Sequence, residues 1–448
     1  MSSARRSAHE PPEHDAPWLR DYLHKSVSFR FAGHTLQFAL SQSLFSSFDV
    51  DTGSRLLLTS VAQQLAEEPE ERGRLRSILD LGCGTGVLGV ALAKHYAADL
   101  TARDRDALAL AVSAHNAARN GVACRTAGGV DTRNLDGSRE GGPFRLVVSN
   151  LPAKAGAPVL AHMIAEAARV TGGGGRIALV VVSNLAAQTR RQLAEVAELI
   201  HEREGHRHTV FHARPRTDRA IASAAPGAPC GALPAPYRRR RAEMTLAGTS
   251  YPLETAYGLP DFDRPSHLSE LAATTMQRRL LATRATGAGA GAGAGAERIL
   301  TWNTGQGHLP VWLAHALAAA PTGNAGRCRH FTLVSRDALQ LLATRANLCR
   351  HGIPEDAVAI YHQVALHQAA GNHDLALLHP DDDLPATARD GLFSAVVPLV
   401  SPGGNVVLYG GAPDIAPLLG RRRPFTLVRE ARRRALRVAI LGAPNDVT

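Results

Sequence analysis

The run from Ile78 to Gly89, Ile-Leu-Asp-Leu-Gly-Cys-Gly-Thr-Gly-Val-Leu-Gly, constrains the fold more than any other part of the chain. Its apolar first half predicts a buried strand, its glycines predict a tight turn, and a helix follows. Such a turn directs backbone N–H groups at the helix N-terminus toward a ligand. Asp80, at the end of the strand, would repel a phosphate but would favour a cationic or amine-bearing nucleoside.

Two ligand classes are compatible with this run. Gly84, Gly86 and Gly89 have the spacing of the dinucleotide fingerprint, and Asp104 follows at about 20 residues, where a ribose-binding acid is found. S-adenosylmethionine carries a sulfonium and an amino group, so it suits an acid at Asp80 better than NAD does. A purely structural glycine turn is the third interpretation.

Composition excludes several classes of protein. The 448 residues are 45% hydrophobic and 20% charged, as in globular proteins of more than one domain. The five cysteines form no C-x-x-C pair, so we expect no metal site and no disulfide framework, and reduced thiols indicate a cytoplasmic location. The polar start does not resemble a signal peptide, and the longest apolar run, 177–182, is too short for a membrane span. The net charge of +10 favours a polyanionic partner such as RNA.

Strand and helix patterns alternate along the first half of the chain. Short strands begin at Ser26, a helix is predicted near 54–67, and further strands are predicted at 78–80, 100–103, 125–127, 146–149, 176–182 and 209–213. This alternation predicts an α/β fold, a mostly parallel sheet flanked by helices with an antiparallel C-terminal strand. We therefore expect a flexible tail over 1–25, a first domain over 26–213 and a Pro/Ala/Arg-rich linker over 214–241.

The second half, 242–448, repeats the first in degraded form. The run from Ile299 to Gly307 matches the run that begins at Ile78. The candidate ligand-binding residues are replaced: Asp80 by Thr301, Gly82 by Asn303, Asp104 by Ser335 and Asn150 by His379. We infer one working site, in the first half, and a companion domain that has lost its site. The alternative is that the second copy binds a different ligand with its own residues.

Two acids follow strands of the first domain. Asp104 could accept hydrogen bonds from two ribose hydroxyls; a helix cap is the alternative, which Asp106 suits better. Asp131 follows Gly128-Gly129-Val130, where an adenine amine would lie, and an ordinary solvated turn is the alternative.

The residues after the strand at 146–149 resemble a known family. Ser149-Asn150-Leu151-Pro152 would lie beside the glycine turn at the carboxyl edge of the sheet. The run is similar to the Asn-Pro-Pro motif of class I S-adenosylmethionine-dependent methyltransferases of the small-domain type. That group includes ribosomal RNA guanine-N2 methyltransferases and N5-glutamine methyltransferases. Leu151 stands where the family has its first proline, and Ala153 stands where the family has a side chain that stacks on a base.

An upstream segment resembles the same family. Phe45-Ser46, followed by Asp51-Thr52-Gly53-Ser54, is similar to a family segment that lies over the cofactor. Together with the glycine turn, these motifs exclude NAD. The resemblance implies two tandem Rossmann-like class I methyltransferase domains, the second degenerate. It also implies that S-adenosylmethionine is bound by Phe45, Ser46, Asp51, Gly53, Asp80, Gly82, Gly84, Gly86, Asp104 and Asp131.

The same resemblance implies methyl transfer to nitrogen. The Asn150 side-chain carbonyl and the Leu151 backbone carbonyl would accept hydrogen bonds from an amine and direct its lone pair to the methyl group, while Pro152 stiffens the turn. A turn-forming role for Asn150 is the alternative. Ala153 cannot stack on a flipped base, so Phe45 is the candidate for that contact.

The expected substrate is the exocyclic amine of a guanine in ribosomal RNA. Arg238–Arg241 and a second arginine group at 421–437, which we place on a helix, would contact phosphates; an ordinary solvated surface is the alternative. A protein glutamine amide or a small molecule is the alternative substrate, and a non-catalytic RNA-binding or assembly factor that keeps S-adenosylmethionine is the alternative class. We expect no membrane partner. The internal duplication is compatible with a monomer, and the sequence leaves the oligomeric state open.

Overall fold

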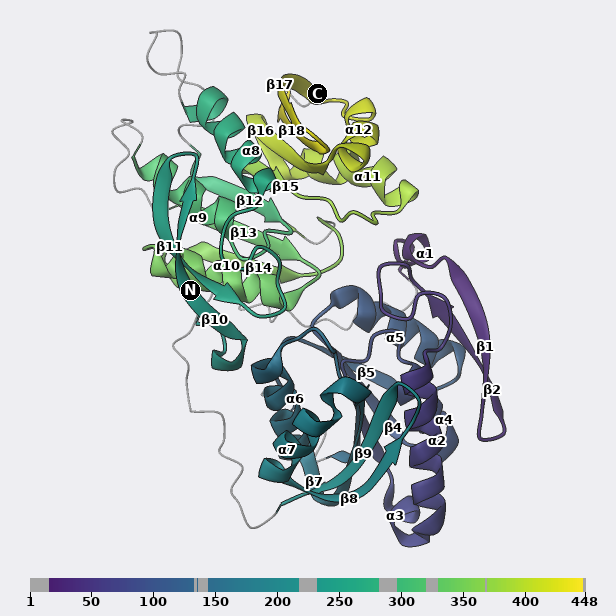
Figure 1. Cartoon of the computed structure of the whole chain (residues 1–448). Helices are drawn as coiled ribbons and strands as arrows, with labels where there is room; N and C mark the ends of the chain where they lie inside the picture. Colours follow the sequence, from purple (N-terminus) through teal and green to yellow (C-terminus); the bar gives the residue numbers. More distant parts are fainter. Residues whose placement is uncertain are drawn as a thin grey trace, which may run out of the picture. The chain divides into compact units, whose positions relative to one another are not determined.

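The computed structural model describes residues 16–132, 135, 144–216, 232–281, 296–319, 329–366 and 369–445. The chain divides into two compact units, 1–226 and 227–448, and the boundary lies within the predicted linker over 214–241. Within the described ranges, each unit is built around one seven-stranded sheet with helices on both faces (Figure 1). The predicted fold class, two α/β domains with mostly parallel sheets, is confirmed.

The sheet of the first unit has the order β5-β4-β3-β6-β7-β9-β8. Its parallel strands are β3 (Ser77–Leu81), β4 (Asp99–Asp104), β5 (Cys124–Gly128), β6 (Phe144–Asn150) and β7 (Thr171–Val182). Two strands at one edge are antiparallel, β9 (His208–Pro215) and β8 (Ala197–Glu204), the latter not predicted. The strand order reverses between β3 and β6, and open α/β sheets bind ligands at the carboxyl ends of strands at such a point.

The two faces of this sheet have separate cores. α2 (Thr52–Glu67) and α4 (Val87–Tyr96) pack on the face that carries Ile78, and α6 (Ala157–Val170) packs on the face that carries Leu79. The two-residue period of a strand sends these neighbours to opposite faces. The remaining elements are the hairpin β1 (Lys25–Phe31) and β2 (His34–Leu40), the helices α3 (Pro69–Arg74), α5 (Ala107–Arg119) and α7 (Ala186–Val196), and the 3-10 turn η2 (Ser183–Leu185).

The second unit has the same strand order, β14-β13-β12-β15-β16-β18-β17. Its strands are β12 (Arg298–Trp302), β13 (His330–Ser335), β14 (Val358–His362), β15 (His373–Leu378), β16 (Val400–Gly411), β17 (Thr426–Arg433) and β18 (Leu436–Gly442), with a hairpin of β10 (Arg238–Leu246) and β11 (Thr249–Ala256). Its helices are α8 (His267–Met276), α9 (His308–Ala318), α10 (Ala338–Arg350), α11 (Ala386–Val396) and α12 (Ala412–Gly420). Short helical turns are η3 (Ala235–Tyr237), η4 (Gln277–Leu281), η5 (Glu355–Ala357) and η7 (Val397–Leu399).

One buried asparagine fastens each unit's hairpin to its glycine turn. Asn116 accepts a hydrogen bond from the Ala39 N–H at 2.8 Å and donates to the carbonyls of Ala39 and Thr85 at 3.0 and 2.9 Å. Asn347 accepts from the Glu254 N–H at 2.9 Å and donates to the carbonyls of Glu254 and Gln306 at 3.0 and 2.9 Å. The two units therefore share hydrogen bonds as well as strand order.

The tail and the linker are shorter than predicted. Residues 16–25 were assigned to the tail over 1–25, but they include helix α1 (Leu19–Tyr22), whose Leu19 and Tyr22 are buried, and the first residue of β1. Within the predicted linker, residues 214–215 end β9 and residues 235–241 form η3 and the start of β10. Residues 1–15 and 217–231 lie outside the described residues. Apolar burial at Leu19 and Tyr22 explains the first correction.

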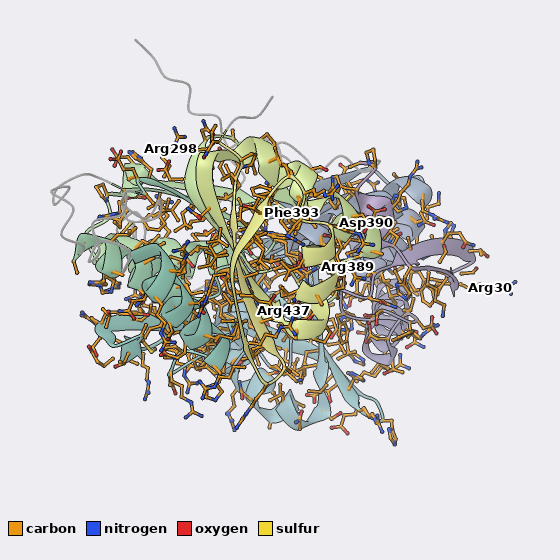
Figure 2. The ribbon with its side chains drawn as sticks, turned by 90° about the horizontal axis from the view of Figure 1, so that it is seen from above. Arg30, Arg298, Arg389, Asp390, Phe393 and Arg437 are labelled. Atoms are coloured by element: carbon orange, nitrogen blue, oxygen red, sulfur yellow. The ribbon has the colours of Figure 1, made fainter. Side chains whose placement is uncertain are left out.

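The predicted arginine-rich helix near the C-terminus is wrong, because this segment forms the strands β17 and β18. Val438 and Ile440 are fully buried at alternate positions of β18, which pairs with β16. Arg437, which directly precedes Val438, lies on this hairpin (Figure 2) and pairs with Glu430 of β17. Pairing with a buried strand therefore overrides the helical preference of the arginines.

Candidate functional site

The glycine turn between β3 and α4 lies at the carboxyl edge of the first sheet. Gly82, Gly84 and Gly86 have φ angles of +77°, +53° and +79°, a region that favours glycine. The N–H groups of Gly82 and Cys83 donate to the Arg103 carbonyl at 2.8 and 3.0 Å, which fastens the turn to β4.

The same turn leaves open space where side chains would otherwise lie. A Cβ on Gly84 would have no neighbour within 4 Å, and one on Gly82 would meet only the Met163 methyl group, at 3.8 Å. A Cβ on Gly86 would instead lie 2.9 Å from the Ser113 hydroxyl. Gly86 therefore allows close packing against α5, whereas Gly82 and Gly84 leave the backbone accessible to a ligand.

Asp80 lies behind the turn rather than on its open side. Its side chain is 1% exposed, and its Oδ2 accepts a hydrogen bond from the Gly89 N–H at 2.8 Å. Burial raises the pKa of this carboxyl to about 7; the Gly89 hydrogen bond lowers it and the charge of Asp104 raises it. Asp80 fastens α4 to β3, so the expectation that its carboxylate faces the ligand is corrected by its burial.

Asp104 lies against the glycine turn. Its Oδ2 accepts from the Gly84 N–H and its Oδ1 accepts from the Asp106 N–H, each at 3.0 Å. Asp106 in turn caps α5 by accepting from the Leu108 N–H at 2.9 Å, which is the capping role predicted for it. Each carboxylate oxygen has more than one acceptor site, so the half-buried Asp104 can still accept hydrogen bonds from a ligand.

Asp131 belongs to the loop after β5, which the structure fastens at both ends. Gly129 donates its N–H to the Asp104 carbonyl at 3.0 Å. Thr132, which follows the half-buried Asp131, donates its N–H to Glu166 on α6 at 2.6 Å. Burial would raise the pKa of Glu166, but hydrogen bonds from Thr132 and the charge of Arg169 outweigh it, so the pKa lies below its ordinary value. Sequence analysis missed Glu166 and Arg169, because a charged pair on a helix is an ordinary surface pattern.

Asn150 ends β6, and its amide nitrogen is held by two residues of the upstream segment. Nδ2 donates to Asp51 Oδ1 at 3.2 Å and to Ser54 Oγ at 3.3 Å. Asp51 is the N-cap of α2, where Oδ1 also accepts from the N–H groups of Gly53 and Ser54 at 2.9 and 3.1 Å. A carboxylate only accepts, so Nδ2 must face Asp51 and the Asn150 carbonyl oxygen faces away. No donor among the described residues holds that oxygen.

The next residues form a tight turn. The Leu151 N–H donates to the Val180 carbonyl at 2.9 Å, which continues the pairing of β6 with β7. The Leu151 side chain is 4% exposed and packs in the core beneath α6. The Pro152 carbonyl accepts from the Ala155 N–H at 3.1 Å, and Pro152 and Ala153 are exposed. Leu151 thus replaces the family's proline with an apolar side chain that anchors the turn from inside.

The segment before α2 carries exposed aromatic side chains. Phe45 is 73% exposed and Phe48 is 68% exposed. Ser46 has a φ of +63°, and its buried Oγ has no hydrogen-bond partner. Both rings are exposed, and stacking of Phe45 on a base stays a prediction.

His208 on β9 is a neighbour of this cluster that sequence analysis missed. Its Nδ1 lies 3.5 Å from the Thr52 hydroxyl, and a Cβ on Gly53 would lie 2.9 Å from its ring. Gly53 therefore leaves room for the ring beside Asp51. The 156 residues between Thr52 and His208 left no local signal of this contact.

The described residues contain no helix long and apolar enough to cross a membrane. The same ranges contain no group of three His, Cys, Asp or Glu side chains that could hold a metal ion.

A solved structure is similar over almost the whole chain. It is the 16S rRNA N2 methyltransferase of T. thermophilus in complex with AdoMet and guanosine, and the match covers 95% of this chain and 99% of that one with a TM-score of 0.57. The two sequences are 17% identical, so the match shows a shared fold of two units and no more.

Sequence relatives match part of the chain. A protein of Bacillus subtilis, YbxB, is 32% identical over 157 residues, which is 34% of this chain and 72% of that protein. The ribosomal RNA small subunit methyltransferase C of Ectopseudomonas mendocina is 31% identical over 170 residues, 37% of this chain and 47% of that protein. A ribosomal protein L11 methyltransferase of Rhizobium etli is 35% identical over 122 residues, 26% of this chain and 38% of that protein. This chain therefore spans less than half the length of the last two relatives.

Residues 35–210 match the family model of the methyltransferase small domain. The matched range contains the glycine turn, Asp104 and the Asn150 turn, and the 32% identical relative YbxB is covered over 72% of its own length. The chain therefore belongs to the methyltransferase small domain family.

Proposed function

We propose that the first unit transfers a methyl group from S-adenosylmethionine to the exocyclic amine of a guanine in ribosomal RNA. The observation that carries this proposal is the orientation of Asn150. Asp51 and Ser54 hold its amide nitrogen, so its carbonyl oxygen is presented as a hydrogen-bond acceptor at the carboxyl edge of the sheet. An amine N–H is the complementary donor.

The residues around the glycine turn fit S-adenosylmethionine. The space over Gly82 and Gly84 admits a ligand close to the backbone, and Asp104 keeps acceptor sites for ribose hydroxyls. Asp131 lies on the neighbouring loop, where an adenine amine would be bound. When bound, S-adenosylmethionine supplies an electrophilic methyl group.

The chain's own groups orient the amine. The Asn150 and Leu151 carbonyl oxygens are two acceptors for the two N–H bonds of one amine. Hydrogen bonds to both would direct the lone pair of the amine nitrogen out of the plane of its N–H bonds. The same two oxygens stabilise the positive charge that develops on nitrogen during transfer. The Leu151 hydrogen bond to Val180 and the Pro152 turn fix these acceptors in advance, and the Asp51 carboxylate polarises the Asn150 amide.

Support for an RNA substrate comes from the named relatives and from charge. The relative from Ectopseudomonas mendocina is named a ribosomal RNA methyltransferase, and this chain carries a net charge of +10. Several of the arginines are engaged within the protein, since Arg239 and Arg240 pair with Asp263, and Arg437 pairs with Glu430. The exposed arginines of the β17–β18 hairpin with no acidic partner in the described ranges are Arg429, Arg433 and Arg434. These three remain for phosphate contacts.

A protein nitrogen is the second candidate acceptor. Several relatives are named ribosomal protein L11 methyltransferases, and the Asn150 acceptor would serve an amine or amide of a protein equally well.

The test incubates the protein with methyl-labelled S-adenosylmethionine and separate pools of undermethylated ribosomal RNA and ribosomal proteins. We expect label in RNA, and a rate about 100-fold lower for Asn150→Ala with unchanged cofactor affinity. Gln37→Ala, which removes an exposed amide on β2, is the matched control and should keep full activity. Label in protein would select the second candidate, and cofactor binding without transfer to either pool would overturn both.

A further inference from the structure

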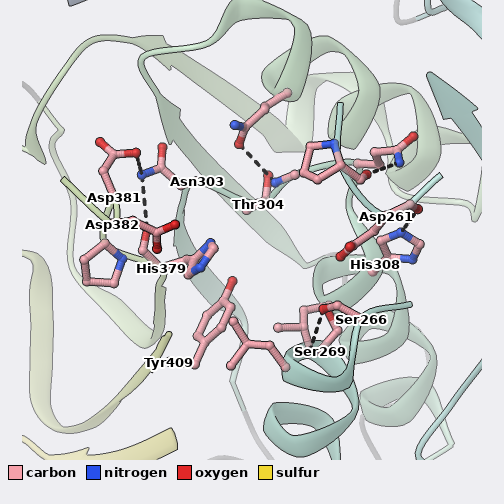
Figure 3. Close-up of a pocket in the computed structure, with 17 residues that line it drawn as sticks. Asp261, Ser266, Ser269, Asn303, Thr304, His308, His379, Asp381, Asp382 and Tyr409 are labelled. Carbon is pink, nitrogen blue, oxygen red and sulfur yellow. Dashed lines mark hydrogen bonds between the residues drawn. The ribbon is translucent and has the colours of Figure 1, made fainter. Parts of the chain in front are cut away.

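The second unit contains a polar cavity of about 180 Å³ at the carboxyl edge of its sheet. It is lined by the loop after β11, the start of α8, the turn after β12, and the ends of β15 and β16 (Figure 3). We infer that this cavity binds a small ligand that carries a primary amine or a guanidinium group. The inference concerns the second unit and does not depend on the function proposed for the first.

The cavity occupies the place that corresponds to the candidate site of the first unit. Asn303 stands where the first unit has Gly82, and His379 stands where it has Asn150. Asp261 has a φ of +60°, and Ser46, its counterpart in the first unit, has a φ of +63°. The backbone around the site is thus retained, and different side chains line it.

These side chains exclude S-adenosylmethionine. Asn303 fills the space that Gly82 leaves open, and its Nδ2 donates to the His379 carbonyl at 3.1 Å and to Asp381 Oδ1 at 3.2 Å. Its Oδ1 accepts from the Ser335 hydroxyl at 3.1 Å, so the side chain bridges three strand ends. Ser335 also replaces the ribose-binding acid. The cavity therefore requires a ligand other than the nucleoside cofactor.

The charged groups of the cavity favour a cation. Asp261, Asp381 and Asp382 all line it. Among the described residues the cation paired with these acids is Arg336, whose Nε lies 3.9 Å from Asp381 Oδ2. Asp261 and Asp382 have no such partner. Burial raises the pKa of Asp381, so the negative charge of the cavity comes chiefly from Asp261 and Asp382, and a ligand cation would neutralise it.

A buried hydrogen-bond acceptor without a donor points to the same chemistry. His308 begins α9, lines the cavity and is 4% exposed. Its Nε2 lies 3.1 Å from the Asp261 carbonyl and donates to it, so Nδ1 carries the lone pair, and Nδ1 has no partner. Burial lowers the pKa of His308, which keeps the ring neutral. Asp381 Oδ2 also accepts no hydrogen bond. Buried polar atoms are normally satisfied, and a ligand N–H would satisfy these two.

An aromatic pair forms one wall of the cavity. The rings of His379 and Tyr409 are stacked, with centroids 5.0 Å apart and planes 8° apart. The Tyr409 hydroxyl points into the cavity, between His379 and Asp261 (Figure 3). A flat aromatic wall suits a guanidinium or the methylene groups beside an ammonium. The small volume admits one such group on a short chain.

The test is a calorimetric titration of the full chain with putrescine, agmatine and N-acetyl-arginine amide, and with 1,4-butanediol as the neutral analogue of putrescine. We expect at least one cation to bind and the diol not to bind. Binding of putrescine indicates an ammonium site, binding of agmatine without putrescine indicates a guanidinium site, and binding of N-acetyl-arginine amide indicates that an arginine side chain can be the source. The double variant Asp261→Asn, Asp382→Asn should weaken cation binding at least 10-fold.

Asp356→Asn removes an exposed carboxylate of the same unit outside the cavity and should bind like the unmodified protein. The thermal midpoint and hydrogen exchange in β11 report whether the second unit of each variant is folded. Absence of binding by all three cations would overturn the inference, as would equal binding by the double variant and the Asp356 control.

Discussion

Asn116 in the first unit and Asn347 in the second make the same set of backbone hydrogen bonds, whereas the residues at the two carboxyl edges differ at almost every polar position. Helix caps are shared as well, since Asp106 and Asp337 each accept one N–H at 2.9 Å from the residue two positions later. Residues whose hydrogen bonds hold the backbone are thus the same in both units, whereas residues proposed to face a ligand differ. Comparing the two units therefore distinguishes the two kinds of residue.

The comparison corrects the interpretation of Asp80. Its replacement by Thr301 was taken as loss of a ligand-binding group. In the first unit Asp80 accepts from the Gly89 N–H, and in the second unit the position of Gly89 is Pro310, which has no N–H. The acid and its donor are therefore missing together. Asp80 holds the backbone through the Gly89 N–H, and Gly82, Asp104 and Asn150 stay the residues proposed for the ligand site.

The largest expected effect concerns the shared asparagines. Asn116→Ala and Asn347→Ala each leave one buried N–H and two buried carbonyls without a hydrogen-bond partner. Each substitution should therefore lower the free energy of unfolding of its own unit by about 3–4 kcal/mol. Hydrogen exchange followed in β2 and β11 measures the two units separately, with Gln37→Ala as control. A loss of protection in both hairpins from either single substitution would show that the units do not unfold independently.

The next prediction concerns a substitution that puts a residue of the second unit at the matching position of the first. Gly82→Asn introduces the residue of the second unit, and asparagine tolerates positive φ, as Asn303 shows at +56°. The side chain would fill the open space over the turn, so S-adenosylmethionine affinity should fall about 100-fold in calorimetry while stability changes little. Gly121→Asn, at a φ of +65° with only Lys94 Nζ within 4 Å, is the matched control. Unchanged affinity in Gly82→Asn would place the cofactor elsewhere.

Much of the fold could be predicted from local patterns. Short apolar runs placed β3, β4 and β6 within one or two residues, because strands buried on both faces read as nearly continuous apolar segments. The spacing from Gly84 predicts a ribose-binding acid at Asp104; in the structure its Oδ2 accepts from the Gly84 N–H at 3.0 Å, and the ribose contact stays a prediction. β8 and the β17–β18 hairpin were missed, because exposed edge strands such as β17 lack a buried periodic face and depend on pairing with distant segments.

The candidate sites were predictable only in part. Asn150 was found by its motif, but its partner Asp51 is 99 residues away, and His208 gave no local signal. The cavity of the second unit could not be predicted, because Asp261, His308 and Tyr409 come together only through the sheet topology. Loss of the family's residues in the second unit predicts loss of that site, which stays a prediction, and it says nothing about what a retained backbone can bind with new side chains.

A third prediction tests the new interpretation of Asp80 through pH. Its pKa is about 7 in the folded protein and about 3.9 in an unfolded chain, so the folded state holds the proton more tightly. Stability contributed by the protonated group is complete below about pH 4 and is lost as pH rises toward 7, by at most about 1.4 kcal/mol per pH unit. Asp80→Asn keeps an acceptor for the Gly89 N–H but cannot ionise. In denaturant unfolding, the stability of the unmodified protein minus that of Asp80→Asn should therefore fall steadily from pH 4 to pH 7. Asp99→Asn, which removes an exposed carboxylate at the start of β4, should show no such trend. A difference that is constant with pH would mean that Asp80 is ionised in the folded protein, and its carboxylate would then be returned to the residues that face a cationic ligand.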